Sequence, residues 1–375
     1  MFGRKLNLFS IFGFQVSIDL SWVIIAILVA WSLSTGWFPF QYEDLSTRTY
    51  WIMGVIGALG LFVSILVHEF AHSMVARSFG QPMRGITLFI FGGIAESGGE
   101  ARTPGQEFFV AIVGPVTSVL LAGTFYLAYR AGVGSGLADP VNGVLGYLAL
   151  INLVLAVFNM IPAYPLDGGR VLRSILWKVK GNVKWATRIA SEVGAGFGVV
   201  LIVLGIFAML AGNVVGGLWR VLIGMFLHGI ARGSYQQLVV RRALEGEPLS
   251  RFMRRDPVVV SPDLTLDRFV EDYVYQYHFK MFPVVSEDRL AGMVTTRDVK
   301  EVPREQWSRT RVEDVARPCM ESNTLSPDTD AMEALSTMSR SGQSRMIVME
   351  NGRLEGVVTL KDMTEFLSLK VDMEE

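Results

Sequence analysis

The sequence is short of the side chains from which disulfide frameworks and many metal sites are built. Its 375 residues include one cysteine, Cys319, and only four histidines. A single thiol cannot form an intramolecular disulfide, and it cannot supply the paired thiolates of a cysteine-based zinc site. Any metal that this chain binds must therefore be held by nitrogen and oxygen atoms.

Charged residues are also scarce. They make up 18% of the chain, whereas hydrophobic residues make up 51%, and the mean hydropathy is +0.38. This composition is too apolar for a soluble protein of this size and indicates a membrane protein. The formal net charge is −1, so no basic surplus points to nucleic acid as a partner. The partner that the composition predicts is the lipid bilayer.

Long uncharged runs occupy most of the first 240 residues. A helix needs about 20 apolar residues to cross the hydrocarbon core of a bilayer. Four runs qualify, the second of them only with its histidine-bearing turn included: 20–40, 51–67, 108–129 and 141–166. A further apolar stretch divides at AGNVVGG into a fifth span near 190–211 and a sixth near 214–234. We therefore expect residues 1–240 to form an α-helical polytopic membrane domain with about six transmembrane helices.

The distribution of basic residues predicts the orientation of these spans. With six crossings both termini lie on the same side of the membrane. Most of the lysines and arginines between the spans fall on that side, and three fall on the other: Arg48, Arg130 and Arg220. The positive-inside rule then predicts a multi-pass protein of the cell membrane with cytoplasmic N- and C-termini.

From about residue 245 the composition becomes that of a soluble α/β domain, and the chain repeats itself. SPD occurs at 261 and 326, and GMVTTRD at 292 is echoed by GVVTLKD at 356. Each copy is predicted to fold as turn, helix, strand, turn, strand and helix. Residues 241–375 resemble a tandem pair of cystathionine-β-synthase-type (CBS) domains, a Bateman module, with copies at about 245–303 and 310–370.

The resemblance of the tail implies a regulatory ligand. In such modules the Thr and Asp of the repeated motif commonly meet the phosphate and ribose of an adenine nucleotide, and an aspartate can accept two ribose hydroxyls. By position the corresponding residues are Thr295, Asp298, Thr359 and Asp362. Many such modules only dimerise, so AMP or ATP binding and a homodimer formed through the tail are both left open.

One apolar run carries polar chemistry. VSILVHEFAHSMVAR (63–77) contains His68, Glu69 and His72. Positions four apart lie one helical turn above each other, so both imidazoles can reach one ion. This H-E-x-x-H arrangement is typical of zinc peptidases, in which the glutamate takes a proton from water. A helix end at the membrane interface could carry the same residues, but three ionisable groups in a lipid-facing span are costly unless they serve a function.

A catalytic zinc needs a third protein ligand and an open position. The fourth span ends FNMIPAYPLDGGRVL, which places Asn159 and Asp167 at the membrane surface on the side where the two histidines emerge. Two prolines in this segment interrupt the helix and allow a loop to bend inward, which favours Asp167 as the ligand. Three other carboxylates compete for this role: Glu96, Glu100 and Glu107.

Together, HEFAH and NMIPAYPLDG match the two motifs of the site-2 proteases, H-E-x-x-H and N-x-x-P-x-x-x-x-D-G. The chain resembles this family of intramembrane zinc metalloproteases (peptidase family M50), which cut transmembrane protein substrates, from about residue 4 to 237. The resemblance implies one Zn²⁺ and five site residues: the ligands His68, His72 and Asp167, the general base Glu69, and Asn159 as a contact to the substrate backbone or the developing oxyanion.

Three polar residues are assigned no catalytic role. At GPVTSV, Ser118 stands where many members of the resembled family have asparagine, which weakens a catalytic role for this position. His228 and His278 have no partner at metal-ligand spacing and are predicted to be structural.

Two stretches have strand-like composition: KLNLFSIFGFQVSI (5–18) and MRGITLFIFGGIA (83–95). They predict a small membrane-associated sheet near the active site. One edge of that sheet could pair with an unwound substrate, or the sheet could only plug the cytoplasmic mouth. A proline at Ile90 or Phe91 would distinguish these two roles.

The sequence leaves three functions open. The first is an intramembrane zinc endopeptidase regulated by its tail. The second is a CBS-regulated transporter or channel, which gives no reason for the spacing of His68, Glu69 and His72. The third is an inactive scaffold that binds transmembrane segments, which the presence of every catalytic residue type argues against.

Overall fold

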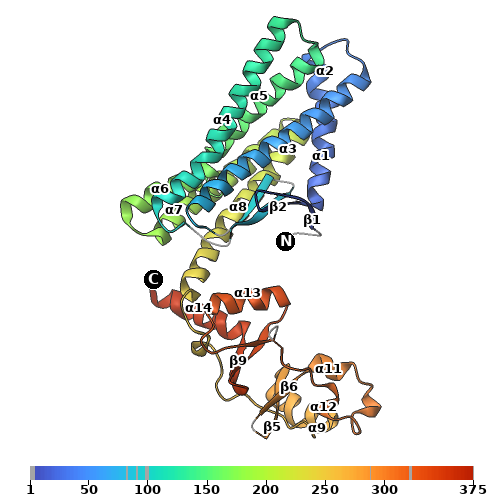
Figure 1. The fold of residues 1–375 in the computed structure, drawn as a ribbon, viewed down its shortest axis with the longest axis vertical. Helices are drawn as coiled ribbons and strands as arrows, with labels where there is room; N and C mark the ends of the chain where they lie inside the picture. The colour runs from blue at the N-terminus through green and yellow to red at the C-terminus, as the bar shows by residue number, and fades with distance from the viewer. Residues whose placement is uncertain are drawn as a thin grey trace. The chain divides into compact units, whose positions relative to one another are not determined.

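The computed structural model describes residues 5–81, 83–89, 92–97, 101–287, 289–320 and 323–374. By contacts the chain divides into two compact units, Met1–Tyr235 and Gln236–Glu375. The first unit is a bundle of long helices with a small sheet, and the second is an α/β unit, so the expected fold class is confirmed. Figure 1 shows α3, α4 and α5 running side by side in the first unit.

Six helical segments in the described part of the chain are long and apolar enough to cross a membrane, as predicted. The first, Leu20–Gln41, joins α1 (Leu20–Ser32), a π-helical stretch (Leu33–Trp37) and α2 (Phe38–Gln41). The other five are α3 (Thr47–Ser78), α4 (Pro104–Ser135), α5 (Asp139–Asn159), α7 (Val183–Leu210) and α8 (Val214–Leu244).

The predicted end of the fourth span is wrong. The expected run 141–166 is too long, because α5 ends at Asn159 and residues 160–166 form a loop. Pro162 and Pro165 lie in this loop, and proline cannot donate the backbone hydrogen bond that would continue the helix. A separate helix, α6 (Asp167–Lys180), begins directly after the loop. The loop therefore delivers Asp167 to the first position of a new helix.

The two strand-like stretches form one four-stranded sheet in the order β1-β2-β3-β4. Its strands are β1 (Lys5–Ile11), β2 (Phe14–Asp19), β3 (Met83–Phe89) and β4 (Gly92–Ser97). The two hairpins are antiparallel, and β2 pairs with β3 in parallel. β1 and β4 are thus the edges of the described sheet. Ile90 and Phe91, the sites chosen for the proline test, lie outside the described residues.

The sheet is fixed to α3 at two places. Ile18, Ile86 and Leu88 are buried and pack against side chains of α3 that include Phe70. At the far end of the helix, Arg77 Nη1 donates a hydrogen bond to the Phe12 carbonyl at 2.7 Å. Because α3 also carries the H-E-x-x-H motif, these contacts hold the sheet beside that motif.

The second unit contains two copies of one α/β arrangement, each with its own core. The first copy contains α9 (Leu266–Phe269), a π-helical stretch (Val270–Val274), α10 (Tyr275–Tyr277), β5 (Met281–Ser286), β6 (Arg289–Thr295) and α11 (Thr296–Lys300). The second contains β7 (Thr324–Leu325), α13 (Ala331–Ser341), β8 (Arg345–Glu350), β9 (Arg353–Thr359) and α14 (Leu360–Glu374), whereas α12 (Val312–Val315) packs on the core of the first copy. Short 3-10 turns occupy Leu249–Arg251 and Arg304–Gln306.

Candidate active site

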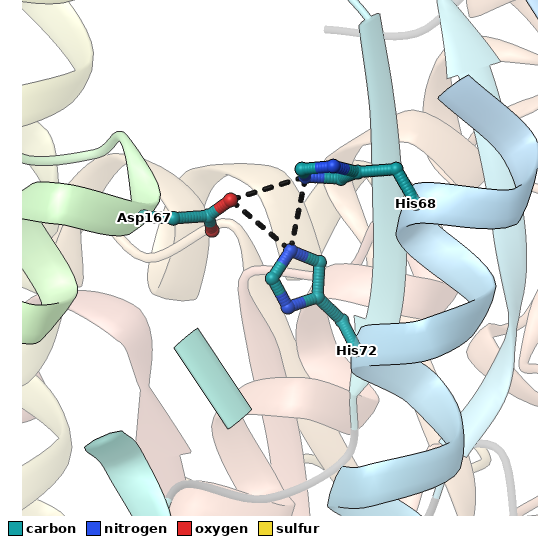
Figure 2. Close-up of side chains that lie close together, drawn as sticks. All are labelled: His68, His72 and Asp167. Carbon is teal, nitrogen blue, oxygen red and sulfur yellow. Dashed lines mark hydrogen bonds and ion pairs between the residues drawn. The ribbon is translucent and has the colours of Figure 1, made fainter. Parts of the chain in front are cut away.

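Three side chains that are far apart in the sequence converge on one point (Figure 2). Asp167 Oδ2 lies 3.1 Å from both His68 Nε2 and His72 Nε2, and the two Nε2 atoms are 3.2 Å apart. All three residues are buried. Ligand atoms held about 2.0–2.1 Å from a tetrahedral zinc lie about 3.3 Å from one another. The observed separations therefore fit one ion bound by two nitrogens and one oxygen.

Local backbone packing places these three atoms. His68 and His72 lie one turn apart on α3. Asp167 begins α6, whose next two residues are glycines packed tightly on the preceding loop. A Cβ at Gly168 would lie 2.3 Å from the Met160 carbonyl oxygen, and one at Gly169 would lie 2.2 Å from the Tyr164 nitrogen. The DGG sequence thus lets α6 begin close enough for its carboxylate to reach the histidines.

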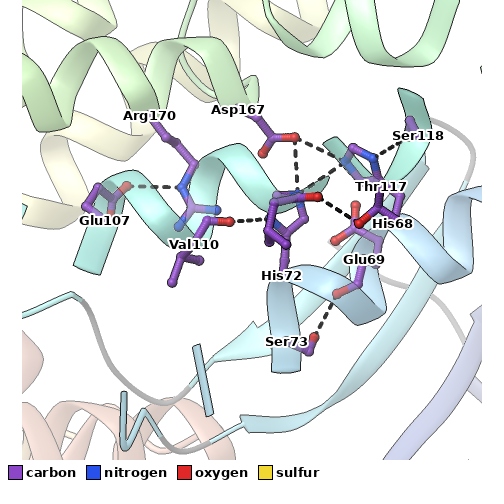
Figure 3. A network of polar contacts seen from close by, with 11 residues as sticks. His68, Glu69, His72, Ser73, Glu107, Val110, Thr117, Ser118, Asp167 and Arg170 are labelled. Atoms are coloured by element: carbon purple, nitrogen blue, oxygen red, sulfur yellow. Dashed lines mark hydrogen bonds and ion pairs between the residues drawn. The ribbon is translucent and has the colours of Figure 1, made fainter. Parts of the chain in front are cut away.

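Helix α4 orients both imidazoles through contacts with their Nδ1 atoms. His68 Nδ1 lies 2.8 Å from Ser118 Oγ, and His72 Nδ1 donates to the Val110 carbonyl oxygen at 2.5 Å. Figure 3 shows the contacts of the two histidines with Ser118 and Val110. Such outer partners fix the tautomer and the rotation of a metal-binding histidine. The hydrogen bond of His72 Nδ1 leaves its Nε2 lone pair free for a metal.

Gly114, also on α4, keeps the convergence point open. A Cβ at this position would lie 2.2 Å from His72 Nε2 and 2.7 Å from His68 Nε2. Every other amino acid would therefore place an atom beside the ligand nitrogens. The donor set, the spacing of its atoms and this glycine together fit a zinc ion.

Glu69 and Asn159 lie at the wall of one cavity with His68 and Asp167. The cavity has a volume of about 460 Å³, and the rest of its wall is largely apolar. That wall includes Ile25 of α1, Phe62 of α3, Leu88 of β3, and Trp219 and Phe226 of α8. Gly93 of β4 packs on Glu69, since a Cβ there would lie 2.5 Å from Glu69 Cγ. The glutamate is thus enclosed between α3 and the edge of the sheet.

Glu107 and the other two histidines are engaged away from the three converging atoms. Glu107 is buried, but its carboxylate is paired with Arg170 and Arg173. The side chains of Glu96 and Glu100 lie outside the description. His228 Nδ1 donates to the Ala195 carbonyl at 3.0 Å, and His278 is an exposed residue that ends α10 with positive φ. Among the described residues, His68, His72 and Asp167 are the group of His, Cys and acidic side chains close enough to hold one metal ion.

The electrostatics of α6 favour an ionised ligand. This helix is not one of the six apolar segments. Burial by itself would raise the pKa of the Asp167 carboxyl, but the adjacent imidazoles of His68 and His72 outweigh burial and hold the pKa below its usual value. Burial would likewise lower the pKa of Arg170, but the Glu107 charge raises it. Asp167 is therefore an anion, which is the form that binds a cation.

Sequence reasoning missed the contribution of α4. It weakened a catalytic role for Ser118, and the structure gives this residue a positioning contact with His68 instead. Gly114 and Ser118 lie four apart in GPVTSV, a spacing that places both on one helical face. The Val110 contact uses a backbone carbonyl, so no residue type at that position could have revealed it.

Replacing Ser118 with alanine should weaken zinc binding by about 10- to 100-fold, the usual cost of losing an outer partner of a ligand. The physical reason is that His68 would lose the contact that fixes its ring. Competition with a chelator of known affinity measures the effect. Ser73→Ala, which removes a hydroxyl that donates to the Glu69 carbonyl of its own helix, is the matched control and should bind zinc normally.

In the second unit, the predicted nucleotide-binding residues cap helices. Thr295 and Asp298 form a capping box at the start of α11, and Asp298 also pairs with Arg317. Thr359 and Asp362 hydrogen-bond to each other in the same way, and Asp362 pairs with Arg254 at 3.1 Å. Both carboxylates are therefore already engaged within the chain.

A cavity of about 300 Å³ lies beside one of these motifs. Of the four predicted residues, Thr295 lines it, whereas Asp298, Thr359 and Asp362 are not among the described residues that do. Four cationic side chains line the cavity: Lys280, Arg297, Arg317 and Arg345. The structure thus surrounds this cavity with positive charge.

Both parts of the chain are similar to known proteins. The model of peptidase family M50 matches residues 56–139 and 135–204, and the CBS domain model matches 249–305 and 312–369. A Synechocystis protein that carries a zinc metalloprotease name is 35% identical over 93% of this chain and 92% of its own length. A Mycobacterium tuberculosis protein with a zinc metalloprotease name is 33% identical over 95% of this chain and 91% of its own length.

A solved structure of a site-2 protease from Methanocaldococcus jannaschii also matches. It is 26% identical, and the match covers 61% of this chain and 94% of that chain with a TM-score of 0.44. The names of the two relatives imply zinc as the metal and peptidase activity. The six apolar helices indicate a multi-pass membrane protein. The chain belongs to peptidase family M50, the family of the site-2 proteases, and carries a tandem pair of CBS domains.

Proposed function

We propose that this chain is an intramembrane zinc endopeptidase that hydrolyses peptide bonds within or near transmembrane segments of substrate proteins. One observation carries the proposal: His68, His72 and Asp167 converge on one point, and His68 and Asp167 lie with Glu69 at the wall of a largely apolar cavity. A cavity of this character suits the side chains of a transmembrane segment. The zinc metalloprotease names of the relatives support the choice of metal.

The residues around the cavity divide the chemistry among them. When bound, zinc supplies a Lewis acid that polarises a carbonyl group and lowers the pKa of water to about 7. Glu69 accepts a proton from the attacking water and delivers it to the leaving amine. Asn159 ends α5 at the same cavity and can donate a hydrogen bond to the substrate backbone or to the developing oxyanion.

Removing zinc tests the proposed reaction. The purified full chain should contain stoichiometric zinc and should cut a transmembrane substrate in proteoliposomes. A chelator should abolish cleavage, and added zinc should restore it. His68→Ala should lose both zinc and activity, because a ligand nitrogen is gone. Zinc at the level of the parent protein in this variant would contradict the proposed ligand set.

Substrate presentation follows from the place of the sheet. A helical substrate must unwind before its peptide bonds can be cut, because its amides are otherwise hydrogen-bonded. We propose that the unwound segment pairs with β4, the edge strand whose Gly93 packs on Glu69. Ile90→Pro or Phe91→Pro tests this pairing. Unchanged cleavage by a folded variant would mean that the sheet only plugs the cytoplasmic mouth.

The two alternatives receive no specific support from the geometry. A transporter or channel does not require three ligand atoms with a glutamate beside them. An inactive scaffold does not require Ser118, Val110 and Gly114 to position the ligand atoms of the histidines. Zinc-dependent cleavage by the purified chain separates the protease from both alternatives.

The tail is proposed to bind AMP or ATP and thereby to regulate proteolysis. The cationic cavity supports a ligand with phosphate groups, but the engagement of Asp298 and Asp362 changes the expected contacts. Titration calorimetry of the full chain with ATP and AMP should show binding that Arg345→Ala weakens by at least about tenfold, because a phosphate loses a charged partner. Asp362→Ala should change it little. Absence of heat with both nucleotides would remove this proposal.

Two properties of the whole protein complete the proposal. The excess of basic residues on one side of the six segments supports cytoplasmic N- and C-termini. The tandem CBS domains support association of the chain into a homodimer through the tail. Protease protection of the tail in oriented vesicles, and the mass of the detergent-solubilised chain with and without residues 241–375, would test the two properties respectively.

A further inference from the structure

A second polar group, with its carboxylate buried, lies beside the ligands and takes no part in the proposed reaction. It consists of Glu107 on α4 and Arg170 and Arg173 on α6. The Glu107 residue is 1% exposed. Figure 3 shows Glu107 and Arg170 joined at one end of the polar network, while Ser118 and His68 meet at the other.

A single carboxylate oxygen holds two successive turns of α6. Glu107 Oε1 lies 3.1 Å from Arg170 Nε and 2.7 Å from Arg173 Nη2. The guanidinium of Arg173 also lies over the Tyr164 ring, 5.3 Å from its centroid. Tyr164 belongs to the loop that ends immediately before Asp167. Glu107 is therefore connected to the helix that begins with Asp167 and to the loop that leads into it.

This contact completes a pattern on one face of α4. Glu107, Val110, Gly114 and Ser118 are separated by three, four and four residues, so they lie in one stripe along the helix. Ser118 contacts His68, and the Val110 carbonyl contacts His72. Glu107 stands at the end of the stripe nearest α6. α4 thus contacts both histidines directly and contacts the helix that carries Asp167 through Glu107.

We propose that Glu107 is a positioning residue that sets Asp167 against His68 and His72 through its ion pairs with Arg170 and Arg173. The inference rests on the proposed function, because it takes these three residues as ligands of one metal. Asp167 itself makes no contact with Glu107. The effect passes through α6, whose first turn contains both Asp167 and Arg170.

Energetics favour a geometric role over a purely stabilising one. Burying the Glu107 carboxylate and the Arg173 guanidinium costs several kcal/mol per ion before the attraction between the charges is counted, and apolar replacements of such clusters are often as stable or more stable. An apolar contact between α4 and α6 would hold the helices together at less cost. However, charged groups with fixed hydrogen-bond directions define a register that interchangeable apolar contacts do not.

Zinc affinity of the detergent-solubilised full chain tests the proposal. Glu107→Gln removes the charge and keeps the size, and it should weaken zinc binding by about 10- to 100-fold. Glu107→Asp keeps the charge and should recover part of that affinity. Glu192→Gln is the matched control, since Glu192 pairs with Arg188 on the exposed surface of α7, and it should bind zinc like the parent protein.

A second variant separates positioning from folding. Glu107→Leu combined with Arg170→Met and Arg173→Met replaces the charges with apolar side chains of similar size. Its metal-free melting temperature should match or exceed that of the parent, yet its zinc affinity should remain at least about tenfold weaker. The visible spectrum of bound Co²⁺, which reports coordination geometry, should also change.

The possible results lead to different conclusions. Parental zinc affinity in Glu107→Gln or in the triple variant would overturn the proposal. His68→Ala distinguishes this failure from that of the proposed function. If His68→Ala loses zinc while Glu107→Gln retains it, only the positioning role fails. If His68→Ala also retains zinc at the parental level, the ligand set itself is wrong.

Discussion

Replacing Glu69 with glutamine should abolish cleavage and leave zinc bound. Glu69 lines the cavity beside the converging atoms, but its carboxylate is not one of the three ligand groups. Glutamine has nearly the same shape and cannot accept the proton of the attacking water. General acid–base groups contribute about 10²- to 10⁴-fold to rate, so cleavage should fall by that factor or more.

Two measurements on the same preparation decide this prediction. Metal analysis should find zinc at the parental level in Glu69→Gln, and turnover of a reconstituted transmembrane substrate should fall to background. Glu43→Gln, in an exposed loop, is the matched control and should retain both properties. Cleavage that survives Glu69→Gln would remove the general-base mechanism, even if zinc proved essential.

Gly114→Ala should prevent zinc binding and therefore cleavage. The added methyl group would lie 2.2 Å from His72 Nε2, at the nitrogen that faces the other ligands. The histidines cannot easily move aside, because their Nδ1 atoms are held by Ser118 and the Val110 carbonyl, which lie on α4 with Gly114. The methyl group would therefore compete directly with the metal. Zinc should no longer co-purify stoichiometrically with this variant.

A second glycine of α4 provides the matched control. A Cβ at Gly123 would meet no atom within 4 Å, so Gly123→Ala makes the same chemical change away from the site. Alanine in a helix interior is favoured over glycine by about 0.5–1 kcal/mol, so this variant should fold at least as well as the parent. Parental zinc affinity in Gly114→Ala would show that the ion does not bind at the two Nε2 atoms.

Much of this protein could be predicted from local sequence. The free energy of transferring a helix from water into lipid depends mainly on the side chains of that segment. Apolar runs in the sequence therefore predicted the six long helices that the structure contains. His68 and His72 are four residues apart, and helical geometry alone brings their imidazoles together. The repeated motif of the tail likewise identified two copies of one unit.

The errors and gaps have a common cause. The fourth span extends too far in the prediction because hydropathy continues through 160–166, whereas prolines and tight glycine contacts end the helix at Asn159. The Thr-x-x-Asp motifs predict ribose contacts, which stay a prediction, and they gave no sign that each aspartate also pairs with an arginine about 20 or 110 residues away in sequence. Such partners depend on which distant segments the fold brings together, and residue type alone does not predict this.

The sequence by itself determined the membrane helices, the metal-binding type of chemistry and the histidine pair, because each of these depends on neighbours within a few turns. Only the tertiary structure decided which carboxylate faces the histidines. Asp167 lies 99 positions after His68 and reaches it, whereas Glu107 is turned to Arg170 and Arg173. The physical reason is that a metal site is set by distances of about 3 Å between side chains, and helix packing brings together residues that no local pattern connects.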